Sequence, residues 1–158
     1  MDHRAINERY AQIAQELIET EDELAYIRES VVSIVYLSST QQKTKADKFV
    51  FGQCEKVADK YKWSIPCDFT ITVFEPNIEQ FTEEQLRILL FHELLHVGID
   101  IGEDGEEKYS IKGHDLEDFK VIIDRYGTDW ATPPESFGEM LTNEVRQKVS
   151  EGVKNGEA

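Results

Sequence analysis

The sequence predicts an α+β fold: a small, mainly antiparallel sheet packed on a central helix, with further helices on its flanks. Short apolar segments follow one another with polar links that leave too little chain for helical crossovers of a dozen or more residues. A helix with a clear N-terminal signature comes next, and an amphipathic segment precedes the strands. The length of 158 residues suits one domain, which we expect over 1–130, with a short C-terminal helix and a frayed tail over 131–158.

The first half of the chain predicts one helix followed by strands. Residues 4–19 carry apolar side chains at helical spacing, and a capping box at 20–23 restarts or extends that helix. Three apolar, β-branched or alternating segments then predict strands, at 31–37, 48–57 and 68–74. Gly52 interrupts the second of these and predicts a bulge.

The best-specified element is a central helix that begins after Thr82. Thr82 and Gln85 form a capping box, and the following residues are apolar around most of the circumference through Val97. We expect this buried helix to end near Gly98 or Gly102. Beyond it the sequence predicts an acidic loop at 102–107, a short edge strand at 108–112, a helix at 115–126 and one more short helix starting at 132.

Composition narrows the class of protein. Seventeen Lys and Arg against 32 Asp and Glu give a net charge of −15, which argues against a broad nucleic-acid-binding surface. No apolar run is long enough for a membrane span, and the charged N-terminus is unlike a signal peptide, so we expect a soluble, cytoplasmic protein without a membrane partner. Cys54 and Cys67 lie on predicted strands as core or edge thiols, not as metal ligands.

The central helix contains the motif H-E-x-x-H, formed by His92, Glu93 and His96. A spacing of four places both imidazoles one turn apart on one face, where they can bind one metal ion. Zn²⁺ is the expected metal, since imidazole suits it and catalytic zinc keeps an open coordination position. Glu93 lies beside that face and is expected to act as the general base on a water at the metal.

A catalytic zinc needs a third protein ligand, and His114 is the expected one. It follows Gly113 at the start of the next predicted helix, from which the chain can fold back on the motif. The carboxylates of Glu117 and Asp118 are the alternatives, and Asp115 is a candidate hydrogen-bond acceptor for a metal-bound imidazole.

These residues carry a resemblance to a known family. The motif H-E-L-L-H at 92–96, the segment H-D-L-E-D-F at 114–119 and the strand segments before them resemble the family of putative phage metallopeptidases and, more distantly, SprT-like zinc metalloproteases. The resemblance covers about residues 20–130. It implies a minimal zincin-like domain with His92, His96 and His114 as zinc ligands and Glu93 as base. The cysteine zinc ribbon and basic DNA-binding surface frequent among SprT-like proteins are absent from this sequence.

The sequence therefore predicts a zinc-dependent hydrolase of peptide bonds that acts on a peptide or protein substrate, which a free sheet edge could hold as an added strand. Tyr109 and Tyr126 are candidates for stabilising the oxyanion. The first alternative is a non-catalytic phage or host regulator with a structural zinc and an acidic surface. The second is an acidic decoy that occupies nucleic-acid-binding proteins.

Overall fold

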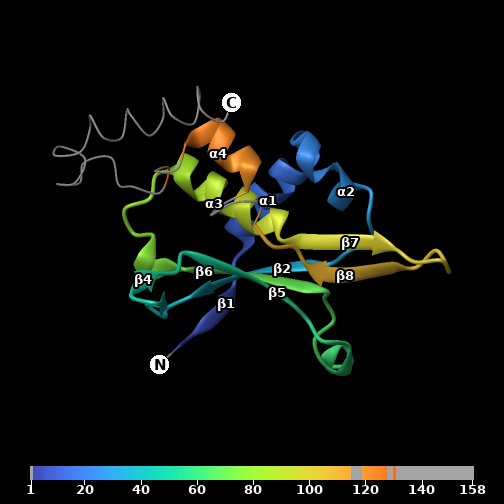
Figure 1. Cartoon of the computed structure of the whole chain (residues 1–158). Helices are drawn as coiled ribbons and strands as arrows, with labels where there is room; N and C mark the ends of the chain where they lie inside the picture. Colours follow the sequence, from blue (N-terminus) through green and yellow to red (C-terminus); the bar gives the residue numbers. More distant parts are fainter. Residues whose placement is uncertain (1, 115–118, 128–129, 131–158) are drawn as a thin grey trace.

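A four-stranded sheet with helices on one face forms the centre of the molecule (Figure 1). The computed structural model describes residues 2–114, 119–127 and 130. The sheet has the order β1-β2-β6-β5, formed by Arg4–Ile6, Ile34–Ser39, Phe69–Phe74 and Gly52–Lys56. The pairs β1–β2 and β5–β6 are antiparallel, whereas β2–β6 is parallel. The predicted α+β class with a mainly antiparallel sheet is therefore confirmed.

Two hairpins of the described part of the chain lie outside this sheet. The strands β3 (Thr44–Lys45) and β4 (Lys48–Phe49) precede β5, and β7 (Val97–Ile101) pairs with β8 (Glu107–Ile111). The remaining elements are α1 (Glu8–Thr20), η1 (Asp22–Leu24), α2 (Ala25–Arg28), η2 (Asp59–Tyr61), η3 (Glu75–Asn77), α3 (Glu83–Leu95) and α4 (Lys120–Tyr126). None of the helices among the described residues is long and apolar enough to cross a membrane.

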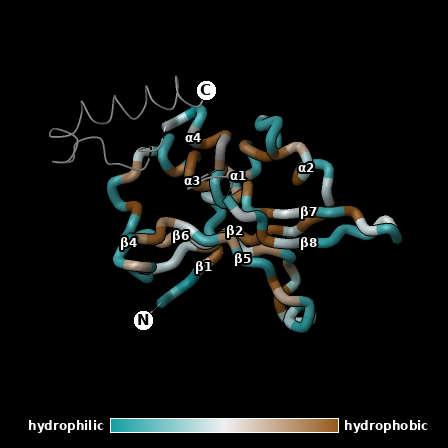
Figure 2. Tube along the Cα trace, in the orientation of Figure 1, coloured by the Kyte–Doolittle hydropathy of each residue, from teal (hydrophilic) through white to brown (hydrophobic). Residues whose placement is uncertain are grey.

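The core lies between the sheet and helices α1 and α3, where hydrophobic residues are concentrated (Figure 2). Alternate residues of β6 point toward the helices, and the side chains of Phe69, Ile71 and Val73 are fully buried. Because α3 packs against both the sheet and α1, it is buried around most of its surface. Each fully buried side chain of this size contributes about 1.5–3 kcal/mol to stability.

The structure corrects the predicted boundaries at two places that matter for the site. Residues 4–6 form strand β1, not helix, because their backbone pairs with β2 and Asn7 provides the N-cap of α1. The central helix ends at Leu95, and residues 97–101 form β7, which was not predicted. The apolar residues of 97–101 continue the helical pattern in sequence, but their backbone is paired with β8 instead.

The predicted strand at 48–57 is divided into β4 and β5, and β5 begins at Gly52. Both cysteines are free thiols, Cys67 buried and Cys54 half-buried. Cys54 lies on β5 as predicted, whereas Cys67 precedes β6 and does not lie on a strand. The predicted residues Asp115, Glu117 and Asp118, the helix expected from 132 and the tail lie outside the described residues.

Candidate metal centre

Helix α3 fixes two of the histidines. Its N-terminus is held by the predicted capping box, in which the Thr82 side chain accepts a hydrogen bond from the Gln85 backbone and the Gln85 side chain accepts one from the Thr82 backbone. His92 lies in the last turn, and His96 is the C-cap with helical backbone angles (φ −75°, ψ −16°). The two imidazoles therefore remain one turn apart on one face, with ring centroids 5.1 Å apart.

The β7–β8 hairpin returns the chain to the end of α3. Val97 pairs with Ile111, so the residue after β8 lies beside His96. The backbone N–H of Lys112 donates to the His96 carbonyl at 2.7 Å, and the His96 Nδ1 lies 2.6 Å from the Lys112 carbonyl oxygen. A carbonyl only accepts, so His96 Nδ1 carries a proton, and in the neutral imidazole Nε2 is then the nitrogen with the lone pair. The hydroxyl of Tyr26, a residue of α2, donates to the Val97 carbonyl at 2.6 Å and so holds the first residue of β7 in place.

Two residues beyond Lys112, His114 completes a group of three imidazoles. Its Nε2 lies 3.1 Å from Nε2 of His92 and 3.0 Å from Nε2 of His96. Two nitrogens bound to the same tetrahedral zinc lie about 3.3 Å apart, since each Zn–N bond is about 2.0–2.1 Å long. Two of the three separations are thus close to the spacing that one metal ion requires, and all three ligand atoms lie within 4.8 Å of one another. This group is the one cluster of potential metal ligands found among the described residues.

Phe119 packs against all three imidazoles. Its side chain is 1% exposed, and its ring centroid lies 5.3 Å from that of His92, 4.9 Å from His96 and 5.2 Å from His114. This apolar ring restricts the rotation of the imidazoles, which a pre-organised metal site requires. The sequence placed Phe119 on the core face of a helix and gave no signal that it would contact the histidines.

Glu93 points from α3 toward β5. It is 4% exposed, and its Oε2 lies 4.0 Å from His92 Nε2, so the carboxylate borders the imidazole group without belonging to it. A Cβ on Gly52 would lie 3.2 Å from both Cγ and Oε2 of Glu93. Gly52 therefore leaves room for this side chain, a role that differs from the predicted bulge.

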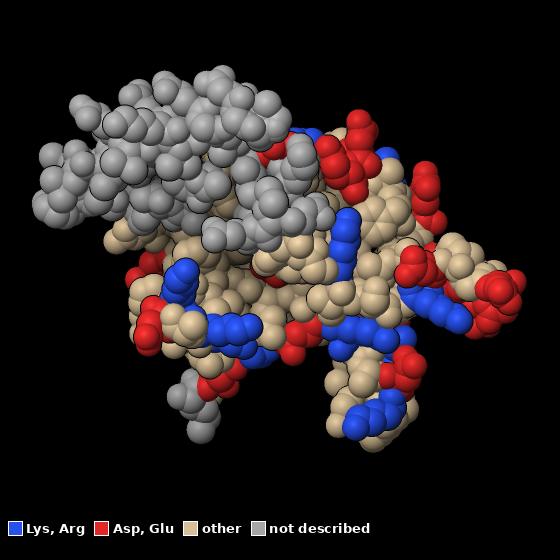
Figure 3. All heavy atoms as spheres, viewed as in Figure 1, with Lys and Arg blue, Asp and Glu red and all other residues tan. Residues whose placement is uncertain are grey.

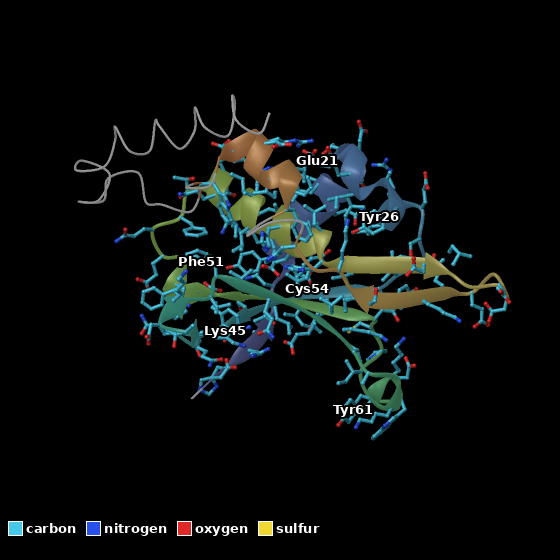
Figure 4. The ribbon with its side chains drawn as sticks, viewed as in Figure 1. Glu21, Tyr26, Lys45, Phe51, Cys54 and Tyr61 are labelled. Atoms are coloured by element: carbon cyan, nitrogen blue, oxygen red, sulfur yellow. The ribbon has the colours of Figure 1, made fainter. Side chains whose placement is uncertain are left out.

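Cys54 lies two residues after Gly52 in β5, so the two residues are on the same face of the sheet (Figure 4). Burial raises the pKa of its thiol, and the nearby Glu93 carboxylate raises it further. The thiol is therefore protonated at neutral pH when no metal is bound.

The remaining predicted residues have contacts in other parts of the molecule. The Tyr109 hydroxyl donates to Glu107 at 2.7 Å and its ring packs on Phe69. Tyr126 lines a pocket at the N-terminal end of α3, so it lies at the opposite end of that helix from His96. The fourth histidine, His3, is exposed next to β1 at the far edge of the sheet.

Fold and site together define an α+β protein with a group of three histidines able to hold a metal ion. The chain belongs to the family described as putative phage metallopeptidase, whose model matches residues 3–141. Comparison with curated proteins and comparison with solved structures gave no match.

Proposed function

We propose that the protein hydrolyses peptide bonds with a zinc ion held by His92, His96 and His114, and that Glu93 is the general base. The observation that carries the proposal is the convergence of three imidazole Nε2 atoms beside a buried carboxylate. The match to a metallopeptidase family supports a peptide or protein as the substrate.

The donor set suits zinc. Three neutral imidazoles are a known ligand set for catalytic zinc, and the hydrogen bond from His96 Nδ1 to the Lys112 carbonyl favours the tautomer that can bind a metal. When bound, zinc would supply a Lewis acid that polarises the scissile carbonyl and lowers the pKa of a water molecule in the open position.

Glu93 has the position expected of a proton carrier. Its carboxylate is buried beside the imidazoles, so it can accept a proton from the attacking water and donate it to the leaving amine. A structural site has four protein ligands and does not need such a carboxylate. The three histidines and the adjacent Glu93 therefore support a catalytic zinc site over a structural one.

The edge of β5 supports binding of an extended substrate. Within the described residues β5 pairs with β6 alone, so the backbone groups of its other edge can pair with a peptide. Gly52, the first residue of β5, lies beside Glu93, since a Cβ at this position would be 3.2 Å from the Glu93 side chain. A peptide added along β5 would therefore pass the proposed base.

Removal of the metal tests this function directly. We expect the purified protein to contain close to one zinc ion per chain and to cleave members of a broad peptide library. Dialysis against a chelator should remove both zinc and cleavage, and stoichiometric zinc should restore both. Zinc analysis and mass spectrometry of the products provide the measurement. Absence of cleavage by the zinc-loaded protein would refute the enzymatic proposal.

Enlarging Gly52 should disturb the base without touching a ligand. A Val side chain at this position would push against Glu93 and Leu89, which lie 3.2–3.3 Å from the Cβ position. We expect Gly52→Val to lower kcat by about 10²-fold, because displacement of a catalytic group by 1 Å has an effect of this order. Zinc content should stay at one per chain. In the matched variant Gly113→Ala the new Cβ meets nothing within 4 Å, and equal losses of kcat in both variants would contradict the argument.

A further inference from the structure

The positive charge of this acidic protein is concentrated around β5. Residues 40–65 contain six Lys and three acidic residues, a net charge of +3, whereas the rest of the chain has a net charge of −18. This segment comprises the β3–β4 hairpin, β5 and the loop with η2. The edge that passes Glu93 is therefore flanked by basic elements at both ends.

The hairpin places two lysines directly opposite each other. Lys45 pairs with Lys48 across the turn formed by Ala46 and Asp47, both of which have positive φ (51° and 62°). Like charges in directly opposite positions destabilise a hairpin. An anionic group bound between them would relieve this repulsion.

The other end of β5 leads into a loop that projects from the sheet (Figure 1). This loop carries Lys60 in η2 and two exposed aromatic side chains, Tyr61 at 49% and Trp63 at 86% exposure. Lys45 and Tyr61 lie beyond opposite ends of β5 (Figure 4). Exposed aromatic rings beside lysines offer both apolar and charged contacts to a bound chain.

Most acidic groups of the segment are already paired. Glu55 lies 3.6 Å from Arg4 on the far face of the sheet, and Asp59 lies 3.5 Å from Lys62, which also contacts Asp68 at 3.0 Å. Of the six lysines in this segment, only Lys62 forms an ion pair with another described residue. Lys43 donates a hydrogen bond to Gln53, and the other four are Lys45, Lys48, Lys56 and Lys60. Figure 3 shows basic side chains over the hairpin, near the end of β5 and at the tip of the loop.

We propose that this surface binds an acidic, extended polypeptide segment along β5, and that such segments are the substrates. The statement that these segments are substrates rests on the proposed function. The binding preference depends only on the charges. A five-residue strand spans about 17 Å. In a peptide bound along β5, we therefore expect one acidic residue next to the scissile bond, near the β3–β4 hairpin. We expect another about four residues away from the scissile bond, near the loop with η2.

A polypeptide fits this surface better than a nucleic acid. The edge of β5 that no other described strand pairs with offers alternating backbone donors and acceptors that match an extended peptide. The net charge of −18 on the remainder of the chain opposes a long polyanion that extends past the basic segment.

Binding to three labelled peptides that differ in charge tests the inference. The peptides share length and central residues and carry Glu, Gln or Lys at the flanking positions. Fluorescence anisotropy with the zinc-loaded Glu93→Gln protein measures affinity without turnover. We expect the Glu peptide to bind about tenfold more tightly than the Lys peptide, with a difference that shrinks as salt is raised. The double variant Lys45→Glu and Lys48→Glu should remove most of this preference.

Lys48→Glu alone should remove part of this preference. Lys108→Glu is the matched control for that single variant, because Lys108 is an exposed lysine on the β7–β8 hairpin and its reversal makes the same change in net charge. Equal affinities for the three peptides would overturn the inference, as would equal effects of Lys48→Glu and Lys108→Glu. Tighter binding of a single-stranded oligonucleotide than of the Glu peptide would assign the surface to nucleic acid instead. If wild type cleaves no peptide while the charge preference persists, the proposed function fails and the binding surface stands.

Discussion

Glu93→Gln is expected to abolish proteolysis while the protein keeps its fold and its zinc. Gln has nearly the same size as Glu and can occupy the space that Gly52 leaves, but it does not accept a proton at neutral pH. Since Glu93 lies outside the group of converging nitrogens, its replacement removes no proposed ligand. We expect kcat to fall by at least ~10²–10⁴-fold, the usual contribution of a general base.

The measurement combines zinc analysis, thermal unfolding and cleavage of a library-derived peptide. Glu84→Gln is the matched control, because Glu84 is an exposed residue in the first turn of the same helix and the substitution makes the same chemical change. Normal cleavage by Glu93→Gln would show that the base is assigned wrongly. Loss of zinc from that variant would instead indicate that the carboxylate supports the metal site.

Replacing any one of His92, His96 and His114 with Ala should lower zinc content and thermal stability together. The three side chains provide the converging nitrogens, so two remaining imidazoles would hold the metal much more weakly. A ligand present at a hundred times its Kd stabilises the native state by about 2.7 kcal/mol. For a chain of this size, loss of that contribution lowers Tm by about 5–10 °C.

His3→Ala is the control for this series, since His3 is an exposed histidine outside the group. With a chelator present, wild type and the three variants should converge in Tm, because the difference comes from the metal. Unchanged zinc content in the His114→Ala variant would exclude it as a ligand. Glu117 and Asp118 would then be the next residues to replace.

The sequence predicted the central helix well because the determinants of that helix are local. Its capping box involves residues three positions apart, and the spacing of His92 and His96 follows from helical geometry. The strands around 34–39 and 69–74 were also recognisable, because β-branched and alternating patterns reflect burial on a sheet. These predictions needed no knowledge of distant contacts.

The sequence failed where pairing between distant segments decides the backbone. Val97 and Ile99 continue the apolar pattern of the helix, yet the pairing with β8 makes them a strand. Residues 4–6 carry no strong strand signal of their own and form β1 by pairing with β2. Such long-range pairing is only weakly encoded in local propensity.

The sequence by itself determined the chemistry available to this protein: two histidines one helical turn apart with a glutamate beside them, and a positive segment within an acidic chain. Only the tertiary structure decided how these groups are used. The β7–β8 hairpin brings His114 to within 3.1 Å of the helix histidines, Phe119 packs on their rings, and Gly52 gives Glu93 its space. The physical reason is that helical spacing is a property of consecutive residues, whereas hairpin register and close packing depend on segments that meet only after the chain has folded.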